Sequence, residues 1–254
     1  RAGPTLAWTP GVRFDYSNLG YGILGRVISN VAEREYRDVV RERLLEPLGM
    51  SATTFELGDA PLDRLAKGYL WRDEAYVTEP FDPYGSLASM GGIYTSVRDL
   101  TRWIGGFTDA FPPRDDPEGG HPMCRASRRE MQQGHRTIPP SIAAGTPDAM
   151  IELESSGYGY GLFVYDDLRF GRVVGHSGGY PGFGSNMRWQ PASGLGVVVL
   201  MNHRYGPATP LAGALLRSLV ASGPVVSTPR RPVAAPALQA ARRAIESLLA
   251  EWDD

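Results

Sequence analysis

The sequence has 254 residues, of which 42% are hydrophobic and 21% are charged. This composition is typical of a globular protein that can bury a substantial core. A formal net charge of −2 and an isoelectric point of about 6.1 give no indication of binding to nucleic acid or to an anionic membrane. No apolar stretch reaches the roughly eighteen residues of a transmembrane helix, so we expect no membrane span.

Cysteine and histidine are too sparse and too scattered to suggest a metal site. Cys124 is the only cysteine, which excludes an intrachain disulfide and a thiolate metal cluster. The four histidines lie far apart, and none has the helical spacing of a two-histidine ligand pair. We therefore expect neither a metal nor another cofactor. The first residues show no cationic start followed by an apolar run, and the sequence does not indicate a compartment.

The first half of the chain is predicted to be mainly helical, because apolar residues recur at three- and four-residue spacings. The expected helices cover 18–34, 35–45, 96–106 and 125–133. Asn18 is the expected N-cap of the first helix, and Ser96, with Asp99 three residues later, has the spacing of a capping box. Mixed strands and turns over 51–92 and a surface loop over 107–124 separate these helices.

After Gly157 the pattern changes to short β-rich runs separated by glycine and proline. The expected strands cover 158–165, 173–176, 185–190 and 196–202. Residues 197–200 are continuously apolar, which predicts a strand buried on both faces. A helix over 211–220 is expected to cover one face of this sheet.

The tail of the chain divides into two parts. Residues 222–236 are proline-rich and are interpreted as a linker. Residues 237–254 carry one apolar stripe, which predicts an amphipathic helix. We expect this helix to be docked rather than membrane-bound, because its polar face is mixed in charge.

Tyr16 and Asn18 lie two residues apart in a segment that follows a Pro-Gly turn and leads into the first helix. In an extended chain such residues point to the same side, so both could face one cleft. Taken alone, the segment is more simply explained as an ordinary helix entry. A tyrosine there could relay protons only if nearby cations lowered its pKa from about 10.

A second segment of interest runs from His176 through Ser177 and Gly178 to Gly179. Alone, it is explained as a glycine-rich strand end with an exposed histidine. A functional interpretation is that the small residues let a substrate lie close to the backbone, whose N–H groups could hold an oxyanion. The histidine could supply a positive or polar group.

The same segment also matches G-x-S-x-G, the nucleophile elbow of α/β-hydrolases, with Ser177 as the serine. That motif needs a helix directly after the serine and an acidic residue before a later histidine. Here turn residues follow, and no Asp or Glu lies between Gly178 and His203. A trypsin-like interpretation of Ser177-Gly178-Gly179 lacks the disulfides and the barrel of short strands that would support it. We disfavour both.

Taken together and in this order, the segments resemble the motifs of the β-lactamase-related serine hydrolases. This family includes penicillin-binding proteins, class C β-lactamases and D-Ala-D-Ala carboxypeptidases. The Tyr16-Ser17-Asn18 segment resembles its Tyr-x-Asn motif, and His176-Ser177-Gly178-Gly179 its third motif. Two connecting segments, 46–50 (EPLGM) and 91–100 (GGIYTSVRDL), resemble a helix end and a Gly-Gly turn of the family.

The resemblance implies a role for each residue. Tyr16 would be the general base or proton relay, and Asn18 would hold the acyl-side amide of the substrate. His176, where many members have lysine, would help to protonate the leaving group or bind a carboxylate. The N–H of Gly179 would be half of an oxyanion hole, and Ser177 and Gly178 would line the substrate. A small-molecule or peptide acyl substrate is implied. Histidine in this motif favours the D-peptidase and esterase branches.

The sequence departs from the family at its first motif, S-x-x-K. Residues 1–15 contain no serine, and the only lysine, Lys67, has Arg64 three positions before it. We therefore expect the nucleophile, its lysine and the other half of the oxyanion hole to lie on a missing N-terminal portion, or to be absent. We also expect the isolated chain to be poorly soluble or partly unfolded.

The resemblance implies an α+β fold of the β-lactamase/transpeptidase type, an antiparallel sheet covered by helices plus a helical subdomain. Residues 1–152 would belong to the helical part and 153–222 to the sheet, followed by the linker 223–236 and the helix 237–254. The implied function is hydrolysis of amide, ester or β-lactam bonds through an acyl-enzyme. The rival hypothesis is a non-catalytic binding protein that kept the cleft without the nucleophile.

Overall fold

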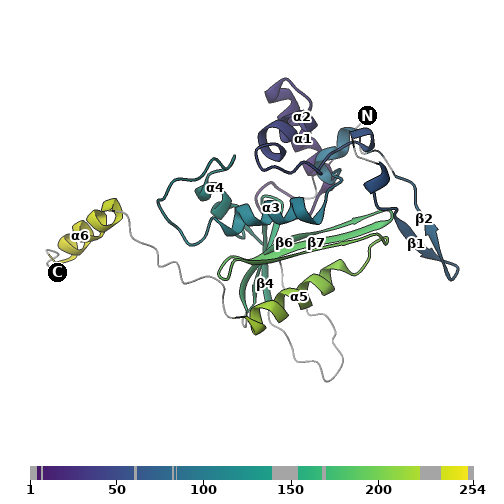
Figure 1. Ribbon diagram of the computed structural model, residues 1–254. Helices are drawn as coiled ribbons and strands as arrows, with labels where there is room; N and C mark the ends of the chain where they lie inside the picture. The colour runs from purple at the N-terminus through teal and green to yellow at the C-terminus, as the bar shows by residue number, and fades with distance from the viewer. Residues whose placement is uncertain are drawn as a thin grey trace.

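The computed structural model describes residues 5, 6, 8–59, 62–81, 83, 85–138, 154–167, 170–223 and 236–250. It has an α+β architecture in which helix α3 (Val97–Thr108) covers one face of an antiparallel sheet and helix α5 (Ala208–Ser222) covers the other (Figure 1). Helices α1 (Asn18–Ala32) and α2 (Tyr36–Val40) lie beyond α3, on the same side of the sheet. The α+β prediction is confirmed.

The main sheet has six strands in the order β3-β4-β5-β6-β7-β8, all antiparallel. Their bounds are β3 Arg136–Ile138, β4 Glu154–Gly159, β5 Leu162–Asp167, β6 Gly171–Tyr180, β7 Phe183–Gln190 and β8 Leu195–Met201. Neighbours in sequence are neighbours in space, and from β4 to β8 the connections are short, as hairpins require. The short strand β3 precedes residue 153, so the sheet draws one strand from the part expected to be helical.

Two strand predictions are wrong in detail. The run 158–165 is two strands, because Tyr160 (φ +52°) and Gly161 (φ +79°) turn the chain between β4 and β5. The apolar run in β8 was expected to be buried on both faces, yet Leu200 is 38% exposed and its three predecessors are only partly buried. The reason is position, since β8 pairs only with β7 among the described strands and so lies at an edge of the sheet.

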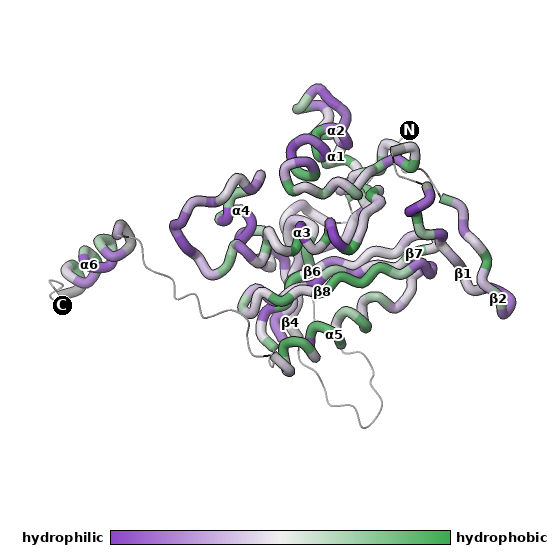
Figure 2. The backbone as a smooth tube through the Cα atoms, viewed as in Figure 1, coloured by the Kyte–Doolittle hydropathy of each residue, from purple (hydrophilic) through white to green (hydrophobic). Residues whose placement is uncertain are grey.

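The larger core lies between α3 and the sheet. Phe107 of α3 stacks on Trp189 of β7, with ring centroids 5.2 Å apart, and both are buried together with Val164 and Val174. The indole N–H of Trp189 donates to Gln132 Oε1 at 2.7 Å, so this buried polar group is satisfied. Figure 2 shows the hydrophobic residues concentrated along the sheet and α5.

A buried carboxylate joins α3 to the chain that precedes it. Ser96 caps α3 by accepting a hydrogen bond from the backbone N–H of Asp99 at 3.2 Å, as predicted. The Asp99 carboxylate, 1% exposed, does not complete a capping box. Instead Oδ2 accepts from the N–H of Ala52 and from the hydroxyl of Thr53, both at 2.8 Å. The helix also extends past Gly106 to Thr108.

Helix α1 begins at Asn18, where the predicted helix begins, but ends at Ala32 and has a different N-cap. Ser17, not Asn18, is the N-cap, and its hydroxyl accepts from the N–H of Gly20 at 2.9 Å. The buried face of α1 consists of Gly22 and Gly25, which pack against the short helix η4 (Gly85–Met90). The apolar stripe of α1 is 39–81% exposed, and its members are Leu19, Ile23, Leu24, Val27, Ile28 and Val31.

A two-stranded hairpin, β1 (Tyr69–Arg72) with β2 (Ala75–Thr78), is attached to the tip of the β6–β7 hairpin. The N–H of Tyr69 donates to the carbonyl of Gly182 at 3.3 Å, and Gly68 lies directly against Gly182. A Cβ on Gly68 would come within 2.8 Å of Gly182 Cα, so glycine is required for this approach. An ion pair between Glu79, just after β2, and Arg204, in the segment after β8, is 2.6 Å long and joins the hairpin to a further part of the chain.

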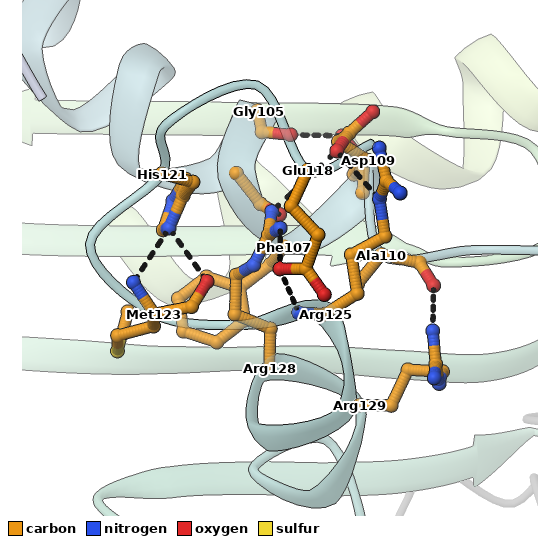
Figure 3. A network of polar contacts seen from close by, with 12 residues as sticks. Gly105, Phe107, Asp109, Ala110, Glu118, His121, Met123, Arg125, Arg128 and Arg129 are labelled. Atoms are coloured by element: carbon orange, nitrogen blue, oxygen red, sulfur yellow. Dashed lines mark hydrogen bonds and ion pairs between the residues drawn. The ribbon is translucent and has the colours of Figure 1, made fainter. Parts of the chain in front are cut away.

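Charged residues fasten the loop 109–124 and helix α4 (Arg125–Glu130) to the end of α3 (Figure 3). Asp109 pairs with Arg114, and the N–H of Arg125 donates to Glu118 Oε2 at 2.7 Å. The Arg128 guanidinium, 1% exposed, donates to the carbonyl of Gly106 and lies 3.6 Å from Asp109. Burial opposes ionisation of Asp109, but the hydrogen bond and charge of Arg114 prevail and lower its pKa.

The last part of the chain differs from expectation. Helix α5 covers the sheet as predicted, with Ala212 and Leu216 buried. Most of the linker, 224–235, lies outside the described residues. Helix α6 (Pro236–Ala250) forms as predicted but lies apart from the sheet and its covering helices (Figure 1). Ile245 and Leu248 are 56% and 65% exposed, so the expected docking is not seen.

We predict that Asp109→Asn destabilises the fold in a pH-dependent way. The folded pKa is lowered, so the stabilisation is present above the unfolded pKa of about 4 and is lost as pH falls through the folded pKa. At pH 7 we expect a loss of about 1–2 kcal/mol in the free energy of unfolding, reduced because Asp109 is partly exposed. Urea titrations at pH 7 and in acid measure this. Asp115→Asn, exposed in the same loop, is the control.

We also predict that the stripe on α1 contributes little to stability. Because Val27 is 49% exposed, Val27→Ser should change the free energy of unfolding by less than about 0.5 kcal/mol and increase solubility. Leu45→Ala, in a buried cluster with Met50 and Phe55, should cost about 2–4 kcal/mol. A large loss in Val27→Ser would mean that this stripe is covered in solution.

Candidate active site

Two side chains far apart in the sequence meet at one end of the sheet. Tyr16, in the loop before α1, and His176, on β6, have ring centroids 6.2 Å apart. Tyr158 of β4 and Phe163 of β5 complete the group, at 5.9 and 6.4 Å from the Tyr16 ring. Tyr16 and His176, to which the family resemblance gave roles in one active site, therefore lie next to each other in the structure.

Hydrogen bonds determine which ring nitrogen of His176 carries the proton. Its Nδ1 lies 2.5 Å from the carbonyl oxygen of Ser177. A carbonyl only accepts, so Nδ1 carries the proton, and Nε2 of the neutral ring accepts from the Tyr158 hydroxyl at 3.5 Å. Burial lowers the pKa of His176, and the bond to Ser177 opposes this only in part. At neutral pH His176 is thus a polar group rather than the cation that the sequence allowed.

Among the described residues, no cation contributes to the pKa shift of Tyr16. Burial, followed by the electrostatic effect of Tyr21, raises the pKa of the Tyr16 phenol above its ordinary value. The phenol is therefore neutral at pH 7 with the described residues alone. The proton relay inferred from the sequence requires the opposite shift, which a positively charged side chain close to the phenolic oxygen would supply.

The register of the β6–β7 hairpin determines where the Gly179 amide points. The two-residue turn Pro181-Gly182 joins Tyr180 to Phe183, so this flanking pair is hydrogen-bonded. Bonded and non-bonded pairs alternate along the ladder, so the next pair, Gly179 with Gly184, is non-bonded, and the N–H of Gly179 points away from β7.

The other side of β6 is uncovered at this point. Strand β5 pairs with β6 only as far as Gly175, which lies opposite Phe163. Among the described strands, none pairs with residues 176–180 on that side. The exposed amide of Gly179 therefore faces an open strand edge, three residues beyond His176. An N–H group in this position can donate to a carbonyl or an oxyanion.

The remaining predicted site residues are neighbours of Tyr16 or His176 in the sequence, and they lie on two different elements of the fold. Asn18 is exposed in the first turn of α1, and Gly178 is exposed on β6. Ser177 is an exposed residue in the middle of an antiparallel strand, not in a strand-to-helix turn. This geometry contradicts the α/β-hydrolase interpretation, whose nucleophile elbow requires such a turn.

Sequence reasoning missed Tyr158 and Phe163. Both lie in the run interpreted as a single strand, although Tyr158 is 8% exposed and touches His176 as well as Tyr16. Burial, followed by the effect of the nearby Tyr21, raises the pKa of Tyr158, so its phenol stays protonated over the whole physiological range. The glycine on either side of Tyr158, which marks close backbone packing, was the available signal.

The described residues contain no group of three or more His, Cys, Asp and Glu side chains arranged to hold a metal ion. None of the helices in these parts of the chain is both long enough and apolar enough to cross a bilayer.

The fold and motifs agree with known proteins. The beta-lactamase family model matches residues 2–222. "Protein flp" of Staphylococcus aureus (strain MW2) is 30% identical over 202 residues, covering 79% of this chain and 35% of that protein. "Unguisins hydrolase ungD'" of Aspergillus campestris is 26% identical over 200 residues, covering 77% of this chain and 34% of that protein.

Solved structures agree as well. The octameric penicillin-binding protein homologue from Pyrococcus abyssi has a TM-score of 0.69 and 29% identity, covering 85% of this chain and 44% of that one. A D-stereospecific amidohydrolase from Streptomyces has a TM-score of 0.61 at 22% identity, covering 82% of this chain and 56% of that one.

The chain belongs to the beta-lactamase family, and the β-lactamase/transpeptidase-like fold that the motifs implied is confirmed. This family includes serine hydrolases. The chain spans about a third of the length of the curated relatives given above.

We predict that Tyr158→Phe raises the pKa of His176. The lost hydroxyl donates to Nε2, which stabilises the neutral ring, so its removal should make protonation easier. Nitrogen-15 chemical shifts of the imidazole against pH measure both the tautomer and the pKa. Tyr160→Phe, in the adjacent turn, is the control. An unchanged His176 titration would show that this hydrogen bond is not made in solution.

Proposed function

We propose that this chain supplies the Tyr-x-Asn and His-x-Gly parts of a serine acyl-hydrolase site. The nucleophile would come from an S-x-x-K segment that is not among these 254 residues. The observation that supports this most strongly is the meeting of Tyr16 and His176 beside an open strand edge. The reaction would be hydrolysis of an amide, ester or β-lactam bond through an acyl-enzyme.

In this proposal the open edge of β6 holds the substrate. The Gly179 N–H donates to the carbonyl oxygen under attack and stabilises the oxyanion that forms there. One such donor is typically worth about 3 kcal/mol in the transition state. Ser177 and Gly178 lie along the same edge, and Asn18 holds the acyl-side amide. An extended peptide or a small amide fits an edge of this kind.

Tyr16 then removes the proton from the serine, and a lysine of the missing segment makes this possible. The cation beside the phenol would reverse the upward pKa shift that Tyr16 has in this chain. Neutral His176 acts as a polar group, with its orientation set by Ser177 and Tyr158. The names of two relatives in the same fold, a D-stereospecific amidohydrolase and a D-amino acid amidase, are consistent with small amide substrates.

A covalent labelling experiment tests the proposal. The 254-residue chain and the product of its whole open reading frame are each treated with a fluorescent penicillin and a fluorophosphonate. We expect no label on the 254-residue chain, because it has no S-x-x-K sequence. We expect label on the whole product, and Tyr16→Phe should slow labelling roughly a hundredfold or more, as expected for loss of a general base.

Tyr76→Phe, an exposed tyrosine on β2, is the matched control and should label at the normal rate. Labelling of the 254-residue chain alone, lost on Tyr16→Phe, would contradict the proposal. A whole product that reacts with neither probe but binds a penicillin reversibly would support the rival hypothesis, a non-catalytic binding protein.

A further inference from the structure

Tyr205 lies against the glycine that carries the proposed oxyanion donor. The segment 202–206 follows β8, and the N–H of Tyr205 donates to the carbonyl of Phe183 at 3.1 Å. Its ring covers the position that a side chain on Gly179 would occupy, so any Cβ there would collide with Cδ1 and Cε1 of Tyr205. Gly179 must therefore be glycine while Tyr205 keeps this position.

The ring is nevertheless mostly in contact with solvent. Tyr205 is 70% exposed, more than Tyr76 or Tyr160. Its Cδ1–Cε1 edge packs on Gly179, the residue whose N–H points to the open strand edge, and most of the remaining side chain is exposed. A carbonyl bound to that N–H at about 2.9 Å would place the adjoining groups of the substrate within side-chain reach of the ring.

The backbone at Tyr205 is strained. Its φ of +48° is in the left-handed region, in a turn closed by the hydrogen bond from Gly206 N–H to His203 C=O at 2.9 Å. Glycine or asparagine is the usual residue at such a turn position. Because the Tyr205 ring is exposed, its burial contributes little free energy to offset this backbone strain. The strained position of an exposed ring points to a role in contacting a ligand.

We propose that Tyr205 is a specificity-determining residue of the acyl-hydrolase site and favours substrates with an aromatic side chain next to the scissile carbonyl. The inference rests on the proposed function. The aromatic side chain would pack against the outer face of the Tyr205 ring while the carbonyl oxygen accepts from Gly179. Pairs of aromatic rings in contact attract one another beyond what their buried area provides.

The test compares phenylalanine amide with alanine amide, each in D and L form, as substrates of the product of the whole open reading frame. We expect a higher kcat/KM for one form of phenylalanine amide than for the matching alanine amide. Tyr205→Gly should reduce this preference about five- to tenfold, the loss of roughly one ring–ring contact. Glycine tolerates the left-handed turn, so this variant should fold.

Two further variants separate selectivity from structure. Tyr205→Phe keeps the ring and should keep the preference. Tyr160→Ala removes another exposed tyrosine with a left-handed backbone, φ +52°, whose ring packs on His135, and should also leave the preference unchanged.

Hydrolysis of both amides with the same preference in Tyr205→Gly as in the unaltered protein would overturn the role of Tyr205 and leave the proposed function intact. Failure to hydrolyse any of the amides, together with failure of covalent labelling, would overturn both.

Discussion

The candidate site depends on the length of one turn. A two-residue connection between β6 and β7 fixes the hydrogen-bonding register of the pair, and this register directs the Gly179 N–H away from β7. One residue more or less in the turn would exchange the bonded and non-bonded pairs and direct that N–H into the ladder. Because β5 stops pairing at Gly175, the same register leaves the amide at an uncovered edge.

The pKa shifts of the two central side chains limit the chemistry that they can perform alone. Tyr16 has a raised pKa and His176 a lowered one, so both are uncharged at neutral pH. Neither can act as a strong base or as a cation without a further charge. A single ammonium group near the Tyr16 phenol would change this balance, so in the proposed function the S-x-x-K segment would supply this charge as well as the nucleophile.

Much of the fold could be predicted from sequence, because its helices and hairpins follow local patterns. The cap at Ser96 and the covering helix α5 are examples. Errors arose where a property of the assembled sheet decides the outcome. The exposure of Leu200 depends on β8 lying at an edge, and the division of 158–165 into two strands depends on a left-handed tyrosine at position 160.

The site was predictable in its motifs but not in its surroundings. Tyr16 and His176 were found because a family resemblance singled them out, and their proximity is present in the structure. Tyr158 and Tyr205 were not found, since no short-range pattern indicates that a tyrosine in a turn or a hairpin strand will touch a residue many positions away. The charge state of His176 also escaped prediction, because burial and the Ser177 carbonyl set it.

The direct contact of Gly68 with Gly182 has a mechanical consequence. Two backbones that touch without side chains between them leave no room to approach further, so the β1–β2 hairpin is held directly against the tip of β6–β7. Trp71 and Tyr76 form the exposed aromatic end of the β1–β2 hairpin, and Gly179 lies three residues before Gly182 in the chain. A partner bound to those two rings would therefore rest on a hairpin that abuts the segment carrying the proposed oxyanion donor.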